Sequence, residues 1–266
     1  MPSASLPRRV YARTPAKLNL FLELLSKRPD GYHEIETIMA AVSCYDTLRI
    51  DRTDLHHEIR LRTHWHPSPD YWQQTLGAGA KAILTIPDDE TNLIHRSIIK
   101  MRTAFGIDSG FDVVARKRAP AGAGMGGASS DAAAAIVGVA ALAGIRDEPT
   151  RLAQIASEVG SDVPFFLGPY ATQTSRSESE KNRFSIANAA PQAAIARGRG
   201  ELLSPFSLAK PIWFVVAYPP VALSTAAVYR VCQVPERPVL ADEMFACLTS
   251  KESNLENFPF MNRLSQ

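Results

Sequence analysis

One glycine-rich stretch, residues 120–130, holds the residue types best suited to binding a phosphate group. Its small residues let backbone N–H groups approach an anion. The helix predicted to begin at its end adds unpaired N–H groups and the positive end of the helix dipole. Two hydroxyls and one ammonium group supply further hydrogen-bond donors. The candidate phosphate contacts are Lys117, Pro120, Gly122, Gly124, Gly126, Gly127, Ser129 and Ser130.

The alternative interpretation of this stretch is a turn between a strand and a helix that binds nothing. Four glycines within six residues, two serines and a flanking lysine favour the phosphate site. Two better-known phosphate loops do not match. A Walker A loop ends in Gly-Lys-Ser or Gly-Lys-Thr, and neither ending occurs here. A dinucleotide fold needs an acid about 20 residues further on, where the chain has alanine and arginine and the nearest acid is Asp147.

The pattern Pro-x-Gly-x-Gly-x-Gly-Gly-x-Ser-Ser-Asp-Ala-Ala resembles the second motif of the GHMP kinases, named for galactose, homoserine, mevalonate and phosphomevalonate. Further segments are similar to one family within this group, the 4-diphosphocytidyl-2-C-methyl-D-erythritol kinases. They are residues 14–22 with 28–34, residues 160–166, residues 92–94, and residues 217–219 with 224–225. The resemblance runs from about residue 9 to residue 256.

The resemblance implies transfer of the ATP γ-phosphoryl group to a substrate hydroxyl, here the 2-hydroxyl of 4-diphosphocytidyl-2-C-methyl-D-erythritol in the non-mevalonate isoprenoid pathway. It makes Asp162 the base and Lys17 its partner, because an adjacent ammonium keeps a carboxylate ionised. The residues alone, without the resemblance, favour non-catalytic roles: a helix-end cap for Asp162 and a surface charge for Lys17. ATP and Mg²⁺ are the expected cofactors, with Mg²⁺ held mainly by phosphate oxygens and water near Ser129 or Ser130.

The resemblance also implies contacts for both substrates. Asn92 and Lys117 are expected on the nucleotide side. The acceptor, a small molecule, is expected to meet Asn19, Tyr32, His33, Thr225 and Tyr229. The alternative for Tyr32 and Tyr229 is that both are half-buried core aromatics.

Two other functions remain open at this point. One is a different GHMP kinase, of the homoserine or mevalonate type; the turn Asp30-Gly31-Tyr32-His33 argues against it, because it matches a cytidine pocket. The other is a non-catalytic nucleotide-binding relative. A zinc site at His56, His57, His64 and His66 is not expected, because these histidines lack helical i,i+4 spacing and nearby cysteines.

Composition describes the class of protein. The chain has 266 residues, 45% of them hydrophobic, and a net charge of +2. It has no basic block for nucleic acid and no apolar stretch near the 20 residues or so that span a bilayer. Three scattered cysteines indicate reduced thiols, so we expect a cytoplasmic protein. Oligomeric state does not follow from the sequence.

Hydrophobic periodicity predicts a mixture of strands and helices. Strands are expected at residues 18–25, 33–42, 46–51, 111–115 and 212–218. Residues 193–197 are expected to be the first ordered segment after the insertion at 171–192. Helices are expected at 92–105, 131–142 and 150–159, the last capped by Thr150 or Asp147. Residues 55–74 read as strand edges around an irregular insertion.

The resemblance implies an α+β fold of two domains. Residues 1–170 would form the ATP-binding domain, with a mixed sheet and the loop-helix unit, residues 171–192 a mobile insertion, and residues 193–266 a partial ferredoxin-like domain. No glycine follows Gly200, so a third glycine-rich motif is expected to be absent. Such a chain is expected to be weakly active or unstable. Residues 61–82 are expected to be a second insertion.

Overall fold

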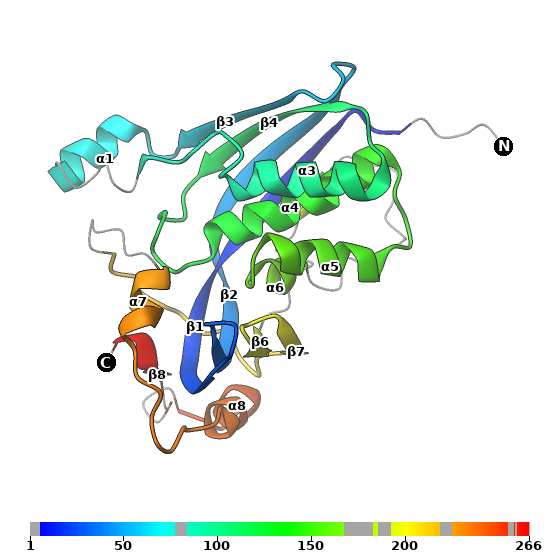
Figure 1. The fold of residues 1–266 in the computed structure, drawn as a ribbon. Coiled ribbons are helices and arrows are strands. Elements are labelled where there is room, and N and C mark those ends of the chain that lie inside the picture. The colour runs from blue at the N-terminus through cyan, green and yellow to red at the C-terminus, as the bar shows by residue number, and fades with distance from the viewer. Residues whose placement is uncertain are drawn as a thin grey trace.

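A computed structural model describes residues 6–77, 84–167, 183–185, 193–218, 225–254, 258 and 260–265. A layer of helices covers one face of a long, twisted sheet (Figure 1). The sheet runs in the order β3 (Ile59–Trp65), β4 (Gly110–Lys117), β2 (His33–Thr53), β1 (Arg9–Lys27) and β5 (Arg183–Ser185). The fold is the predicted mixture of α and β.

The strand β2 is longer than the sequence predicted. We expected separate strands at 33–42 and 46–51, and this division is wrong, because β2 is continuous from His33 to Thr53. Its register against β1 shifts between Pro15 and Ala16. A bulge of this kind absorbs extra residues without ending a strand. The first half of β2 pairs with β6 (Ala193–Gly198) and the second half with β4, so β2 changes neighbours near the bulge.

Four helices follow β3 in the helical layer: α3 (Leu93–Phe105), α4 (Gly127–Ala143), α5 (Pro149–Val159) and α6 (Val163–Leu167). The predicted helices at 92–105 and 131–142 are confirmed, although α4 begins earlier, at Gly127. Twelve of the 17 residues of α4 are buried, because its alanine and aliphatic side chains meet the sheet on one side and neighbouring helices on the other. The predicted caps of α5 are wrong: Pro149 occupies the first position after Glu148, and no side chain caps the helix.

The segment after residue 55 is more regular than expected. It forms β3, which pairs in parallel with β4 at one edge of the sheet, and the short helix α1 (Pro69–Leu76). Only Leu61 of β3 is buried, and charged side chains on its exposed positions pair locally, as Arg62 does with Asp112. A strand with one buried residue carries little hydrophobic signal, which explains why the sequence did not reveal it.

The C-terminal part adds β6, β7 (Leu202–Phe206), α7 (Thr225–Val231), α8 (Asp242–Thr249), β8 (Met261–Asn262) and a 3₁₀ turn, Arg263–Ser265. The predicted strand at 212–218 is wrong: this segment has no regular secondary structure and pairs with no strand in the described ranges. Ile212 and Phe214 pack on the core, whereas Trp213 and Val215 are 90% and 100% exposed.

The predicted domain boundaries remain a prediction. Segments on both sides of them share one sheet, since β6 pairs with β2 and β8 with β1. The predicted insertion at 171–192 lies outside the described residues except for β5. None of the helices in the described ranges is long and apolar enough to span a membrane.

Candidate active site

The glycine-rich loop joins β4 to α4 and has an unusual backbone. Gly122, Gly124 and Gly126 have φ angles of 70°, 69° and 68°, whereas Ala123 and Met125 between them do not have positive φ. Such alternation turns successive N–H groups toward one concave side, which attracts anions. Gly126 then precedes the first turn of α4, whose free N–H groups and dipole add to the attraction. This backbone fits the phosphates of a nucleoside triphosphate.

The loop rests directly on β1. The backbone N–H of Lys17 donates to the carbonyl of Met125 at 2.8 Å. A Cβ atom added at Gly126 would lie 3.0 Å from Lys17 Cγ and 3.0 Å from the Phe166 ring. Only glycine combines this close contact with a positive φ. The loop and the side chain of Lys17 are therefore in contact.

Lys17 also contacts Asp162. Its Nζ atom lies 3.4 Å from Asp162 Oδ2 and donates to Asn19 Oδ1 at 2.7 Å. The side chain of Lys17 is 7% exposed and that of Asp162 is 31% exposed, so the pair is enclosed on one side and open on the other. Asp162 lies in the turn between α5 and α6, which brings it to β1. The structure thus brings together three residues expected in the site: Lys17, Asn19 and Asp162. The alternative of a surface charge does not hold for Lys17, because its side chain is buried.

An aromatic pair lies near Asp162. The rings of His33 and Tyr229 are 5.8 Å apart, centroid to centroid. Burial, reinforced by the negative charge of Asp162, raises the pKa of Tyr229 to about 12. Burial lowers the pKa of His33, with a contribution from Lys27, and His33 Nε2 has no hydrogen-bond partner among the described residues. A neutral imidazole with a free ring nitrogen can bind a polar ligand.

The remaining expected acceptor contacts are placed differently. Tyr32 is 57% exposed, and its ring packs under the Arg199 guanidinium at 5.1 Å. Thr225 begins α7, but its side chain lies outside the described part of the chain, as does Ser224. Sequence reasoning missed Gly200, which approaches the site: a Cβ atom there would lie 3.8 Å from Asp162 Oδ1.

Lys117 points into the protein beneath the loop, where its ammonium donates to Asp46 and Asp131. The two carboxylates outweigh the effect of burial and raise the pKa of Lys117. Burial, together with the charge of Asp46, raises the pKa of Asp131 to about 6 despite the opposing attraction of Lys117. Sequence reasoning missed Asp46 and Asp131, and only the acid in the motif Ser-Ser-Asp hinted at the second.

The other expected nucleotide contacts lie at helix starts. Asn92 caps α3 by accepting from the Ile94 N–H at 2.9 Å, and its amide donates to the Pro87 carbonyl at 2.7 Å. Ser129 is half-buried in the first turn of α4, and the buried Ser130 hydroxyl has no hydrogen-bond partner in the described part of the chain. Among the described residues, no three His, Cys, Asp or Glu side chains group to hold a metal ion.

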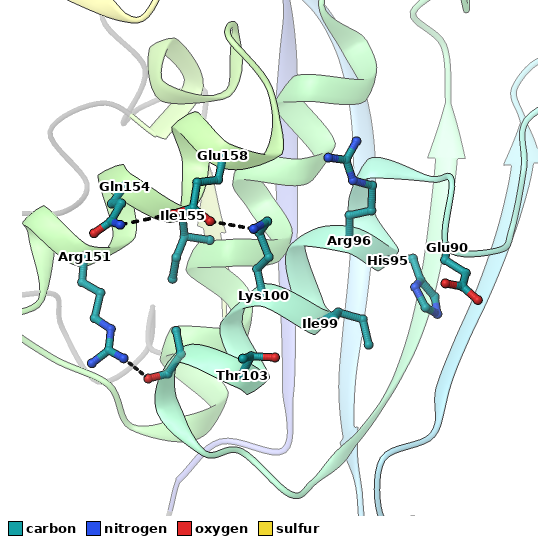
Figure 2. A pocket seen from close by; sticks show the side chains of 11 residues that line it. Glu90, His95, Arg96, Ile99, Lys100, Thr103, Arg151, Gln154, Ile155 and Glu158 are labelled. Carbon is teal, nitrogen blue, oxygen red and sulfur yellow. Dashed lines mark hydrogen bonds and ion pairs between the residues drawn. The ribbon is translucent and has the colours of Figure 1, made fainter.

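A separate cavity of about 710 Å³ lies along α3 and α5 (Figure 2). Two of its charged side chains pair with each other, Lys100 with Glu158 at 2.6 Å, and Arg151 donates to the Ala104 carbonyl. None of the candidate site residues lines this cavity. The candidate residues assembled around Lys17 and Asp162 lie apart from this cavity.

The family model for the GHMP kinases N terminal domain matches residues 92–168. A protein of Rhodopirellula baltica is 39% identical over 242 residues, covering 88% of this chain and 69% of the relative. A protein of Bacillus pumilus is 33% identical over 222 residues, covering 84% of this chain and 63% of the relative. Both are named 4-diphosphocytidyl-2-C-methyl-D-erythritol kinase. The chain thus spans about two thirds of the length of these relatives.

Solved structures show the same similarity. A crystal structure of 4-(cytidine 5'-diphospho)-2C-methyl-D-erythritol kinase matches with a TM-score of 0.63 and 27% identity, covering 96% of this chain and 76% of that one. A crystal structure of homoserine kinase from Cytophaga hutchinsonii matches with a TM-score of 0.51 and 17% identity, covering 93% of this chain and 66% of that one. The second match shows a shared fold only.

Proposed function

The chain belongs to the 4-diphosphocytidyl-2-C-methyl-D-erythritol kinase family, and from this membership we propose that it phosphorylates the 2-hydroxyl of that cytidine-linked compound with ATP. The reaction would serve the non-mevalonate (MEP) isoprenoid precursor pathway. The printed names of the relatives, at 39% and 33% identity, support this substrate over homoserine or mevalonate. The proposal covers the activity of a chain that spans about two thirds of those relatives.

One observation carries the proposal: Lys17 connects the loop to Asp162. Its backbone binds the loop at Met125, and its ammonium lies 3.4 Å from Asp162 Oδ2. Phosphoryl transfer has a loose transition state, so the protein mainly positions groups and stabilises charge. The open side of Asp162 can accept the proton of the acceptor hydroxyl, and the Lys17 ammonium can stabilise the negative charge that develops there.

The loop amides and the first turn of α4 would hold the triphosphate, which supplies the phosphoryl group. The His33–Tyr229 pair would hold the cytosine, because an aromatic stack contributes about 0.5–1.5 kcal/mol beyond buried area. Arg199 over Tyr32 would border the same pocket. We further propose that the enzyme works in the cytoplasm, since its three cysteines are unpaired.

A coupled assay of ADP release tests the proposal. The chain is incubated with ATP and Mg²⁺ and, separately, with the cytidine-linked acceptor, homoserine or mevalonate. We expect turnover with the first acceptor and none above background with the others. Turnover on homoserine or mevalonate would overturn the substrate assignment, and ATP binding without turnover on any acceptor would indicate a non-catalytic nucleotide-binding protein.

A further inference from the structure

Three buried ionic side chains lie beneath the glycine-rich loop, apart from the Lys17–Asp162 pair. Lys117 ends β4, and its ammonium donates to Oδ2 of both Asp46 and Asp131. The exposed fractions of Lys117, Asp46 and Asp131 are 5%, 1% and 2%. Ionic groups this deeply buried are costly unless they are paired, so their arrangement calls for a physical role.

Asp46 fixes the start of the loop. Its Oδ1 atom accepts from the backbone N–H groups of Arg118 and Ala119, the second at 2.9 Å. These two residues immediately precede Pro120, where the loop begins. Because Asp46 lies on β2 just after the bulge, it ties the beginning of the loop to the centre of the sheet.

Asp131 fixes the other end. It lies in the second turn of α4, and its Oδ1 atom accepts from Thr14 Oγ1 on β1 at 2.7 Å. Lys117 donates to the second oxygen of each acid and so joins the two anchors. Thr14 is itself only 1% exposed, so this contact is buried like the rest of the cluster.

The cluster also touches the helix start that would face the phosphates. A Cβ atom added at Gly127 would lie 3.3 Å from Asp46 Oδ2 and 3.5 Å from Lys117 Nζ. Between the two anchors, other contacts also hold the loop: the Lys17 N–H donates to the Met125 carbonyl, the Tyr218 hydroxyl donates to the Ala121 carbonyl at 2.9 Å, and the Met125 side chain packs with Ala16. Among these contacts, the cluster is the one that holds both ends of the loop.

We propose that Lys117, together with Asp46 and Asp131, positions the glycine-rich loop for the triphosphate, and that Lys117 does this without contacting the nucleotide. This inference rests on the proposed kinase function and adds positioning residues to it. Backbone donors bind an anion best when they are already oriented. Removing the ammonium leaves two buried carboxylates facing each other, and their repulsion would displace both ends of the loop.

The test compares Lys117→Met, the double variant Lys117→Met/Asp131→Asn and Thr14→Val. The dissociation constant for ATP is measured by equilibrium dialysis, at a temperature where melting curves show each protein folded. We expect Lys117→Met to weaken ATP binding at least about tenfold, equivalent to about 1.4 kcal/mol, and the double variant to recover most of that loss. Thr14→Val, which cannot touch the nucleotide, should weaken ATP binding about threefold. Lys100→Met, in the exposed pair with Glu158, is the matched control and should bind ATP normally.

A direct role for Lys117 gives a different pattern. If Lys117 bound phosphate itself, the double variant would bind ATP as weakly as Lys117→Met, and Thr14→Val would bind normally; that result overturns the proposal. In turnover assays the KM for ATP should rise while the KM for the acceptor stays within about twofold, and equal rises in both would also overturn it. ATP binding needs no acceptor, so this inference can be tested apart from the proposed function. If the variants show the expected order of ATP dissociation constants but the wild type phosphorylates no acceptor, the result contradicts the proposed function and still supports this inference.

Discussion

Glu23 on β1 and Glu36 on β2 face each other directly across the strand pair, and both carboxylates are buried. Like charges opposite each other destabilise a sheet unless each is paired. Each acid here accepts hydrogen bonds from one arginine and one backbone N–H group of the C-terminal part: Arg263 and Val239 at Glu23, Arg197 and Ala241 at Glu36. The two acids therefore hold the C-terminal segments on the sheet.

Replacing Arg263 with methionine should destabilise the protein by about 2–3 kcal/mol, because it leaves the Glu23 carboxylate buried without its bidentate partner. The estimate is below the usual range for a buried pair because the Arg263 side chain is 22% exposed. Urea unfolding measures the change. Arg60→Met, which breaks an exposed pair with Glu58, is the control and should leave the free energy of unfolding almost unchanged. Equal losses of unfolding free energy in Arg263→Met and Arg60→Met would contradict the role of Glu23 in holding the C-terminal segments on the sheet.

The contribution of Asp131 to the stability of the protein should fall as the pH rises from about 4 to about 6. Its pKa is about 6 when folded, above its ordinary value of 3.8, so the folded state binds the proton more tightly. The stabilisation is complete below pH 3.8 and is lost as the pH rises through 6, up to about 3 kcal/mol in all.

Asp131→Asn removes this titration and is the comparison. The free energies of unfolding of the variant and the wild type are measured in urea at several pH values, and their difference should shift in favour of the variant between about pH 4 and pH 7. Parallel curves for the two proteins would show that Asp131 keeps its ordinary pKa.

Asp162→Asn should lower kcat by about 10²–10⁴-fold, because an amide cannot accept the hydroxyl proton. ATP binding should change little, since the loop does not depend on the Asp162 side chain. Steady-state kinetics and equilibrium dialysis check the two quantities. A variant with full turnover would exclude Asp162 as the base.

Gly126→Ala should weaken ATP binding more than Gly124→Ala does. Both positions have a positive φ, which strains alanine by about 1–2 kcal/mol. At Gly126 the new methyl group also meets Lys17 and the Phe166 ring at 3.0 Å, whereas at Gly124 it meets nothing within 4 Å. Dissociation constants for ATP test this difference, and identical values would argue against contact between the loop and Lys17.

Tyr229→Ala should raise the KM for the cytidine-linked acceptor about tenfold through loss of its ring, equivalent to about 1.4 kcal/mol, with the KM for ATP unchanged. Tyr229→Phe keeps the ring and should behave like the wild type. The pKa of about 12 keeps the Tyr229 hydroxyl neutral. Ionisation of this hydroxyl should therefore cause no change in the acceptor KM between about pH 7 and pH 10. An unchanged KM in Tyr229→Ala would remove this residue from the acceptor site.

Local patterns predicted much of the helical layer. The apolar spacing of residues 92–105 and the alanine-rich run before Gly144 became α3 and α4, because a helix is encoded by neighbours within a few residues. The extent of β2 and the unpaired state of residues 212–218 were not predictable in this way. A strand acquires its partners from distant parts of the chain, and β2 changes from β6 to β4 along its length.

The sequence by itself determined the chemistry that is available: a loop able to bind phosphate, and, through resemblance to a kinase family, Lys17 and Asp162. The tertiary structure decided how these groups are used. It placed Lys17 against both the loop and Asp162, turned Lys117 inward to two acids, and buried Glu23 opposite Glu36. The physical reason is that residue type sets which bonds a side chain can form, whereas burial and partners far along the chain select which of them it forms.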